Sequence, residues 1–368
     1  MIALMNALQA GNRSGTGVYA VELARRLPGL APDVDVRIAW PEGLPLPDGV
    51  DPSPFLPRRA SSTFQRVLYD EWLVRRDARR LGADLVHYPG AVACPSGDRP
   101  TVVTVHDLSF LREPDWFRIE RALYYRATVQ RGVRRAARII AVSHSTARDL
   151  VELLRVPEAK IDITPEAARE GFRPASEEAK AHVRAQYGLP ERFFLYLGTI
   201  EPRKNLVRLI QAFSQVADQC AADLVLAGRW GWKTAGVRAA IETSSHAARI
   251  HCPGFIREED LPALLSCATV FVYPSLHEGF GMPVIEAMAC HVPVITSNVS
   301  SLPEVAGDAA FLINPYDADA LAHAIKTVES DEMLRRKLSD RGARRAAEFS
   351  WARTVELTLA VYRKAVQS

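Results

Sequence analysis

Residues 269–289 carry the stretch that decides the fold, TVFVYPSLHEGFGMPVIEAMA. Its β-branched and aromatic beginning, 269–274, predicts a buried strand. The apolar run after Gly281 predicts a helix that begins near Met282, with Pro283 in the first turn, where proline is tolerated. A strand, a glycine-bearing loop and a helix in this order form part of a βαβ unit, the building block of parallel sheets.

The same alternation of short strands and helices runs through most of the chain. It predicts an α/β protein with two Rossmann-like, doubly wound domains. An irregular stretch at 164–176 separates an N-terminal domain, 1–170, from a C-terminal domain, 171–350, and the proline-rich stretch 41–57 is expected to be a loop. Strands are expected at 2–8, 34–40, 84–88, 101–106, 138–143, 160–164, 193–198, 223–228, 249–254, 269–274, 292–296 and 309–313.

The composition is that of a soluble globular protein, with 368 residues, 48% of them hydrophobic and 24% charged. No apolar run approaches the roughly 18–20 residues that span a bilayer. The N-terminal sequence MIALMNAL lacks the basic segment of a signal peptide. Five cysteines without a Cys-x-x-Cys pair indicate a reducing compartment, so we expect a cytoplasmic protein. The net charge of +3 is too small to indicate nucleic-acid binding.

One segment is unusually basic. Between Arg112 and Arg138 there are eight arginines and three acids, with aromatic residues among them. One interpretation is a solvated helix face whose aromatic side chains pack on the core. The other is a basic, aromatic face that lies on an anionic membrane. The aromatic residues are Trp116, Phe117, Tyr124 and Tyr125.

Two glutamates flank the expected helix start in the opening stretch. The free N–H groups at Phe280, Gly281 and Met282, together with the helix dipole, predict an anion site. Carboxylates on both sides of it, Glu278 and Glu286, do not suit a simple phosphate pocket. They suit a nucleotide sugar, because a carboxylate can accept hydrogen bonds from two neighbouring hydroxyls. The alternative for Glu286 is a charge partner of the helix N-terminus.

Two adjacent cations, Arg203 and Lys204, follow the expected strand that ends at Gly198. They precede a helix whose N-cap is expected to be Asn205. Ligands of doubly wound sheets bind beyond the carboxyl ends of the strands, here in the deep cleft expected between the two domains. This position suits cations that neutralise a diphosphate.

A second glycine pattern, Gly15-x-Gly17-x-x-Ala20, is close to a dinucleotide fingerprint. The fingerprint requires its first glycine directly after the strand, whereas about seven residues intervene here. Asp33 and Asp35 lie roughly where a ribose-binding acid is expected. A nicotinamide enzyme therefore stays open as an alternative.

His106 and Asp107 follow the strand 101–106 and are expected to face the same cleft. A polar contact with substrate is favoured over a purely structural pair. The nine histidines show no metal-ligand spacing, and no Gly-x-Ser-x-Gly elbow indicates a hydrolase.

These residues together resemble the retaining glycosyltransferases of family 4, which have two facing Rossmann-like domains (the GT-B fold) and include bacterial mannosyltransferases. HEGFGMPVIEAMACHVPVI matches the Glu-x7-Glu motif of that family, with Glu278 and Glu286 as its glutamates. LGTIEPRKNL, AVSHSTARDL, VHDLSF and SSLPEVAGDAAFLINPYD also resemble family segments, in the expected order. The sequence departs from many relatives at ITPEAAREGF, where they have an Asn-Gly turn.

The resemblance implies a role for each candidate residue. Glu286 is expected to bind the ribose and Glu278 the transferred sugar, with His106 near the anomeric carbon. The final helix, 351–368, is expected to return to the N-terminal domain. The remaining expected donor contacts are Arg203, Lys204 and Gly17 at the diphosphate, the backbone of Phe280, Gly281 and Met282 at sugar and phosphate, and Ile256 at the base.

The resemblance also implies the reaction. We expect transfer of a hexose, mannose or a deoxyhexose, from a GDP-sugar, with retention and without a bound metal or other cofactor. The acceptor is expected to be a saccharide or lipid-linked saccharide, used in cell-surface polysaccharide or glycolipid synthesis, with the enzyme on the inner face of the cytoplasmic membrane. The alternatives are a nucleotide-sugar epimerase, which needs no acceptor, an NAD-linked oxidoreductase, and a noncatalytic nucleotide-sugar sensor.

Overall fold

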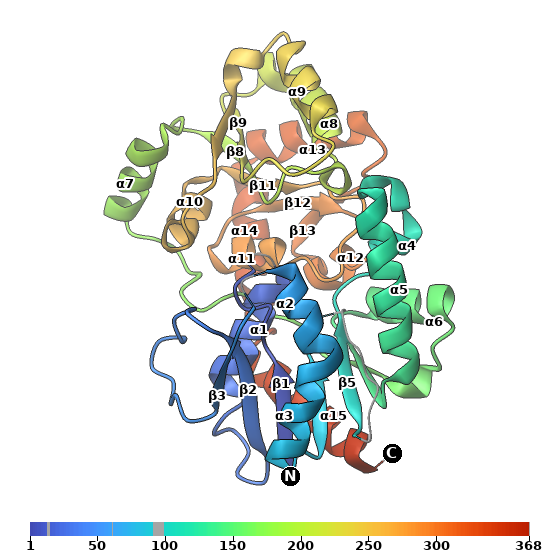
Figure 1. Ribbon diagram of the computed structural model, residues 1–368. Coiled ribbons are helices and arrows are strands. Elements are labelled where there is room, and N and C mark those ends of the chain that lie inside the picture. The colour runs from blue at the N-terminus through green and yellow to red at the C-terminus, as the bar shows by residue number, and fades with distance from the viewer. Residues whose placement is uncertain (13–14, 61, 91–98, 368) are drawn as a thin grey trace. The chain divides into compact units, whose positions relative to one another are not determined.

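The computed structural model describes residues 1–12, 15–60, 62–90 and 99–367. The chain forms two compact units: unit 1 joins Met1–Glu166 with Ser350–Ser368, and unit 2 is Ala167–Phe349. Each unit contains a parallel sheet with helices on both faces (Figure 1). The expected fold class, α/β with two Rossmann-like doubly wound domains, is therefore confirmed.

Unit 1 is built on a seven-stranded parallel sheet in the order β3-β2-β1-β4-β5-β6-β7. The strands β4 and β5 are buried at every position; TVVTV at β5 is apolar or hydroxylated throughout, as in sheets covered on both faces. The strands are β1 (Ile2–Asn6), β2 (Asp35–Pro41), β3 (Phe55–Arg58), β4 (Leu85–Tyr88), β5 (Thr101–Val105), β6 (Arg138–Ala141) and β7 (Ile161–Ile163).

The end of the expected loop 41–57 is a strand instead. β3 pairs in parallel with β2, with Phe55 opposite Ile38, and forms one edge of the sheet. Pro57 lies inside β3, which an edge strand tolerates because one side of it needs no ladder hydrogen bonds. This short strand was not predicted because the prolines in 41–57 indicate a loop.

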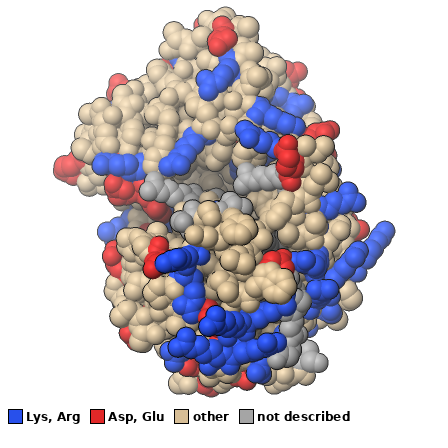
Figure 2. Space-filling model, viewed as in Figure 1, with Lys and Arg blue, Asp and Glu red and all other residues tan. Residues whose placement is uncertain are grey.

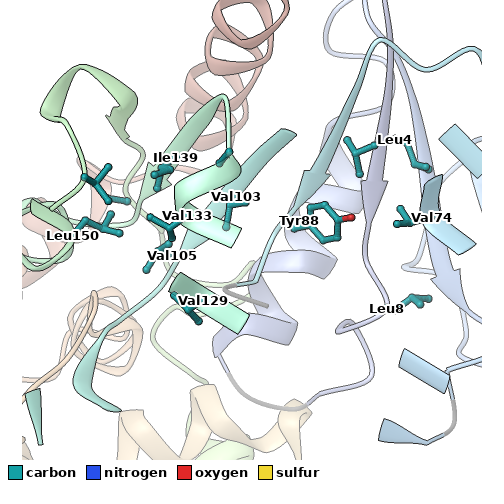
Figure 3. Packing of buried hydrophobic residues seen from close by; sticks show 14 of the residues in the cluster. Leu4, Leu8, Val74, Tyr88, Val103, Val105, Val129, Val133, Ile139 and Leu150 are labelled. Carbon is teal, nitrogen blue, oxygen red and sulfur yellow. The ribbon is translucent and has the colours of Figure 1, made fainter. Parts of the chain in front are cut away.

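Two groups of helices cover the sheet of unit 1. In Figure 1, α3 and α5 lie in front of the sheet, and α15 lies behind it beside α1. Figure 3 shows Val129 and Val133 of α5 close to Val103 and Val105 of β5. The helices are α1 (Gly15–Arg26), α2 (Thr63–Leu68), the π-helix η1 (Tyr69–Leu73), α3 (Val74–Leu81), α4 (Ser109–Arg112), α5 (Ile119–Arg135), α6 (His144–Leu154) and α15 (Trp351–Gln367).

The final helix α15 packs within unit 1, although it follows unit 2 in the chain. It contacts α1 and the strands β4, β5 and β6. Tyr362 is fully buried there, and Thr354 donates a 2.7 Å hydrogen bond to the carbonyl of Pro165. The last helix therefore completes the core of the N-terminal sheet.

Unit 2 has a six-stranded parallel sheet in the order β10-β9-β8-β11-β12-β13. The strand order reverses between β8 and β11, and doubly wound sheets bind ligands at such a point, beyond the carboxyl ends. The strands are β8 (Phe193–Leu197), β9 (Asp223–Ala227), β10 (Ile250–Gly254), β11 (Val270–Tyr273), β12 (Val294–Ser297) and β13 (Ala310–Ile313). The helices are α7 (Glu177–Tyr187), α8 (Leu206–Val216), α9 (Ala235–Glu242), α10 (Leu261–Cys267), α11 (Met282–Ala289), α12 (Leu302–Ala306), α13 (Ala318–Ser330) and α14 (Glu332–Ala347).

Candidate functional site

The loops after β8 and β11 bring the predicted cations to the first predicted glutamate. Arg203 and Lys204 form a 3₁₀ turn, η4 (Pro202–Lys204), five residues beyond β8. Glu278 lies in the loop after β11. A backbone hydrogen bond of 2.9 Å from the Leu276 N–H to the Arg203 carbonyl joins the two loops. Neighbouring strands thus place three residues from distant parts of the sequence together.

Glu278 accepts hydrogen bonds from both cations, one on each carboxylate oxygen. Lys204 Nζ donates to Oε1 at 2.6 Å, and Arg203 Nη1 donates to Oε2 at 2.8 Å. Arg203 also donates to Glu201 at 3.1 Å, and Lys204 donates to the hydroxyl of Tyr273 at 2.6 Å. Two acids and two bases therefore form one buried, charge-balanced cluster, which we call the ion-pair cluster: Glu201, Arg203, Lys204 and Glu278.

The cluster changes the proton affinities of its members. Burial by itself would raise the pKa of Glu278, but the positive charges of Arg203 and Lys204 lower it to about 2. Burial and the neighbouring Arg203 lower the pKa of Lys204, and Glu278 opposes them. Glu278 is therefore a stable carboxylate at neutral pH, held among donors.

The loop between Glu278 and α11 is fixed by two serines that the sequence analysis missed. The Glu278 N–H donates to Ser300 Oγ at 3.0 Å. Ser301 Oγ donates to the carbonyls of Glu278 and Phe280, at 3.0 and 2.8 Å. Both serines follow β12, so their place after a third neighbouring strand was the available signal.

The predicted anion site lies at the start of α11. Gly281 is the N-cap residue with φ of 106°, and a Cβ there would lie 2.8 Å from Leu302 Cδ2, so the turn needs glycine. Met282 begins the helix, as predicted, with Pro283 in its first turn. The first N–H groups of a helix have no partner within it, so this end of α11 can bind an anion.

Glu286 is nearly fully buried in the middle of α11 and is paired with Arg169. Arg169 Nε donates to Oε1 at 2.6 Å, and Arg169 Nη2 donates to Oε2 at 3.0 Å. This pairing replaces the alternative in which Glu286 only balances the helix N-terminus. Arg169 was not predicted from the sequence, although it lies in ITPEAAREGF, where many family members have an Asn-Gly turn instead.

In unit 1, His106 follows β5, and both of its ring nitrogens have protein partners. Nδ1 is 2.9 Å from a Glu166 oxygen, and Nε2 is 2.8 Å from the Pro89 carbonyl. Burial acts to lower the pKa of His106, but Glu166 and the carbonyl outweigh it and raise the pKa. His106 does not pair with Asp107, whose carboxylate instead accepts from the backbone and hydroxyl of Ser109.

Gly17 lies in α1 with a packing reason to be glycine. A Cβ there would lie 1.6 Å from the carbonyl oxygen of Asn12. The glycines 15 and 17 are inside the helix rather than directly after β1, which ends at Asn6. The dinucleotide fingerprint is therefore not formed.

The comparisons with known proteins agree with this geometry. Residues 13–168 match the family model "Glycosyltransferase Family 4", and residues 180–345 match "Glycosyl transferases group 1". The O-antigen chain mannosyltransferase B of Escherichia coli is 35% identical over 266 residues, which cover 71% of this chain and 70% of that protein. The chain belongs to the family-4 glycosyltransferases.

Two further similarities bear on function and fold. The serotype-specific mannosyltransferase WbdA of Escherichia coli is 31% identical over 293 residues, 75% of this chain but only 35% of WbdA. The sucrose-phosphate synthase of Thermosynechococcus elongatus has a TM-score of 0.77 with 23% identity, over 98% of both chains, and supports the GT-B fold.

The nicotinamide alternative is wrong for this glycosyltransferase. Asp35 begins β2, so both acids lie at the amino end of that strand, opposite to the edge where a dinucleotide ribose binds. Both acids also form ion pairs within the protein: Arg363 pairs with Asp33 at 3.0 Å, and Arg37 pairs with Asp35 at 2.8 Å. The expected strand 34–40 had already placed both acids at its beginning, so only their distance along the sequence from the glycines suggested a ribose-binding acid.

The remaining predicted residues of the glycosyltransferase site are apolar or structural. Ile256 lies two residues after β10 and is buried, and its side chain has no polar atom that could select a base. Asn205 occupies the N-cap position of α8, but its side-chain amide donates to the carbonyls of Pro274 and Pro315 instead of capping the helix. Within the described part of the chain, no group of three His, Cys, Asp or Glu side chains could hold a metal ion.

Proposed function

We propose that this glycosyltransferase transfers a hexose, mannose or a deoxyhexose, from a GDP-sugar to a saccharide acceptor, with retention and without a metal. The observation that carries the proposal is the buried ion-pair cluster beside the N-terminus of α11. Its two cations hold Glu278 in the loop directly before that helix, at the carboxyl edge of the sheet of unit 2. Such a region suits the diphosphate of a nucleotide sugar.

The chemistry follows from charge. Breaking the anomeric bond leaves positive charge on the sugar and negative charge on the departing nucleoside diphosphate. Arg203, Lys204 and the start of α11 stabilise the developing negative charge, and preorganised stabilisation of this kind is usually the largest contribution to catalysis. Glu278, which holds both cations, orients them and can accept hydrogen bonds from sugar hydroxyls. The leaving phosphate then takes the acceptor proton in a front-side attack.

The GDP donor is supported by the resemblance to mannosyltransferases, and the two E. coli relatives, both mannosyltransferases by name, support mannose as the transferred sugar. Their names also support a role in cell-surface polysaccharide synthesis. Thermal-shift screening against GDP, UDP, ADP and dTDP tests the base. GDP at about 100 times its Kd should add about 2.7 kcal/mol to the free energy of unfolding. Stabilisation by UDP but not by GDP would reject the GDP donor. Transfer from GDP-mannose, with the product's anomeric configuration read by NMR, tests retention.

We further propose a lipid-linked acceptor, with unit 1 resting on an anionic membrane surface. Part of the segment predicted for this contact, 112–138, is instead involved in ion pairs and core packing within unit 1. Arg112 pairs with Asp149 and Glu152, and Arg131 and Arg138 pair with acids of unit 1. Phe117 and Tyr125 pack against the core. These side chains are used within the fold, so the helix face alone does not explain membrane contact.

A surface formed by α2, η1 and α5 supplies the exposed apolar side chains that a membrane contact needs. α2 and η1 lie beside α5, because Arg131 of α5 pairs with Glu71 of η1. Together these helices expose a row of large apolar side chains, spaced four residues apart on each helix. We call it the apolar ridge: Phe64 (75% exposed), Leu68 (40%), Trp72 (68%), Ile119 (71%) and Leu123 (60%).

Exposed arginines lie on α5 and on α3, the helix that directly follows η1. Arg76 and Arg80 of α3 and Arg126 and Arg134 of α5 are exposed. Figure 2 shows Lys and Arg side chains gathered over α3 at the foot of the molecule. Apolar side chains beside arginines suit a surface that inserts shallowly among anionic headgroups, where each basic residue contributes on the order of 1 kcal/mol. Within the described residues, no helix is long and apolar enough to cross a bilayer.

A further inference from the structure

Arg169 makes more contacts than an ion pair needs. Besides its two hydrogen bonds to Glu286, its Nη1 donates to Glu258 at 2.8 Å. Its guanidinium also lies over the ring of Phe172, with Cζ 4.5 Å from the ring centroid. Burial acts to lower the pKa of Arg169, but Glu286 and Glu258 outweigh it and raise the pKa. Four contacts with three side chains hold this side chain in one place.

The geometry of the pair leaves Glu286 able to bind a ligand. Each carboxylate oxygen has two lone pairs, and Arg169 takes one from each oxygen in a bidentate arrangement. The second lone pair of each oxygen stays available for a hydroxyl. Because the guanidinium is planar and fixed by Glu258 and Phe172, it also fixes the plane of the Glu286 carboxylate.

We infer that Arg169 is a positioning residue that orients Glu286 to accept hydrogen bonds from both hydroxyls of the donor's ribose. The inference rests on the proposed nucleotide-sugar donor and on the expectation, from the family resemblance, that Glu286 binds the ribose of that donor. Arg169 touches no substrate in this role. It supplies the positive charge that a buried carboxylate requires, and it sets the direction of the two lone pairs that face the diol.

Replacing Arg169 by lysine distinguishes the contribution of its charge from the contribution of its orienting hydrogen bonds. Arg169→Lys keeps a positive charge but loses the bidentate fork and the flat contact with Phe172. If Arg169 only neutralises Glu286, Arg169→Lys should bind donor nucleotides normally. If it orients the carboxylate, the variant should lose its recognition of the diol while keeping its recognition of the diphosphate.

The experiment measures Kd by calorimetry for GDP and UDP and for their 2′,3′-dideoxy forms, which lack the diol. Wild type should prefer each natural nucleotide over its dideoxy form by about tenfold or more, the value of hydrogen bonds to a charged group. Arg169→Lys should reduce this preference to about twofold or less by the same principle. Arg249→Lys is the matched control, because Arg249 also forms a paired, partly buried ion pair within unit 2, with Asp223; it should keep the preference.

Two further variants guard against loss of folding. Glu286→Gln combined with Arg169→Met removes both charges of the pair; it should stay folded, bind dideoxy nucleotides as wild type does and lack the preference for the diol. An Arg169→Lys variant that keeps the preference, or one that binds GDP more tightly than wild type does, would overturn the inference while leaving the proposed function intact. A wild type that binds GDP or UDP without preferring the diol would overturn the inference and the expectation that Glu286 binds the ribose, whereas a wild type that binds neither GDP nor UDP would overturn the proposed donor.

Discussion

The two units of the molecule share a fold but differ in the chemistry at the carboxyl ends of their strands. In unit 2 this edge carries four formal charges in one buried ion-pair cluster, together with a helix N-terminus. In unit 1 the corresponding edge carries His106, held by one acid and one carbonyl. The parallel sheet provides the place for a site, and the loops after its strands decide which ligand fits.

The difference divides the work of the enzyme. A cluster rich in cations and N–H donors suits a diphosphate, and in our proposal unit 2 binds the donor. An edge with few charges suits a neutral sugar, and the exposed surface of unit 1 suits a lipid-linked acceptor. Substitutions in unit 2 should therefore affect the donor, and substitutions in unit 1 should affect the acceptor.

The largest effect is expected from Glu278→Ala. The substitution leaves Arg203 and Lys204 buried without their shared carboxylate, and it misplaces both cations and the sugar. We expect kcat/KM for sugar transfer to fall by about 100-fold or more. Steady-state kinetics with GDP-mannose measures the fall, and Glu242→Ala, at an exposed site of α9, is the control. A kcat/KM within threefold of wild type would remove Glu278 from the site.

Much of unit 2 could be predicted from the sequence, because its signals are local. The strand 269–274, the helix start at Met282 and the two cations after a strand each depend on a few neighbouring residues. Their meeting at Glu278 could be expected from one rule, that the carboxyl ends of neighbouring parallel strands lie together.

The parts that the sequence did not reveal depend on contacts between distant residues. Arg169 and Glu286 are 117 positions apart, and nothing in either segment names the other. Likewise, the prolines around β3 led to the prediction of a loop. The apolar ridge was not predicted, because its residues come from helices in two separate parts of the chain. The basic segment 112–138 also suggested more free positive charge than it has. The sequence does not show that Arg112, Arg131 and Arg138 pair with acids of unit 1.

The next effect is expected from Arg203→Ala and Lys204→Ala. Each variant removes a cation from the diphosphate and from Glu278, so kcat/KM should fall by about 10- to 100-fold, the value of one charge-assisted hydrogen bond. The KM for an acceptor should change little, because the acceptor belongs to unit 1. EDTA should leave wild-type transfer unchanged, because in the proposed mechanism the side-chain cations take the place of a metal. Activity that EDTA abolishes and Mg²⁺ restores would contradict the metal-independent mechanism.

A smaller effect concerns the apolar ridge of unit 1. Wild type should float with phosphatidylglycerol vesicles at low salt and not with phosphatidylcholine vesicles, because the attraction is electrostatic and screened by salt. Trp72→Ala combined with Leu123→Ala should reduce the floated fraction several-fold without changing the Kd for GDP. Met333→Ala is the matched control, since Met333 is 82% exposed on α14 of unit 2. Wild type that ignores anionic vesicles at low salt would show that the ridge serves another purpose.

The smallest effect is a change in how stability depends on pH, and it separates two histidines of unit 1. His106 has a raised pKa in the folded protein, so its contribution to stability is complete below the unfolded pKa of about 6.5 and is lost as pH rises through the folded value. His87 behaves in the opposite way. It is buried between Tyr362 and Thr104, and burial lowers its pKa to about 3. The unfolded chain binds a proton at His87 below about pH 6.5 and the folded one does not, so His87 weakens the fold as the solution becomes acidic.

Urea denaturation of His106→Asn and His87→Asn at about pH 5.5 and about pH 8.5 tests this contrast. Each difference is the free energy of unfolding of wild type minus that of the variant. For His106→Asn the difference should be larger at the acidic pH, because the charged pair with Glu166 is then present in wild type and absent in the variant. For His87→Asn it should be smaller at the acidic pH, because the variant no longer loses stability to a protonated unfolded state. If both differences change with pH in the same direction, His106 is not held as a cation by Glu166. The edge of unit 1 would then carry carboxylates without a cation, in contrast with the charge-balanced ion-pair cluster of unit 2.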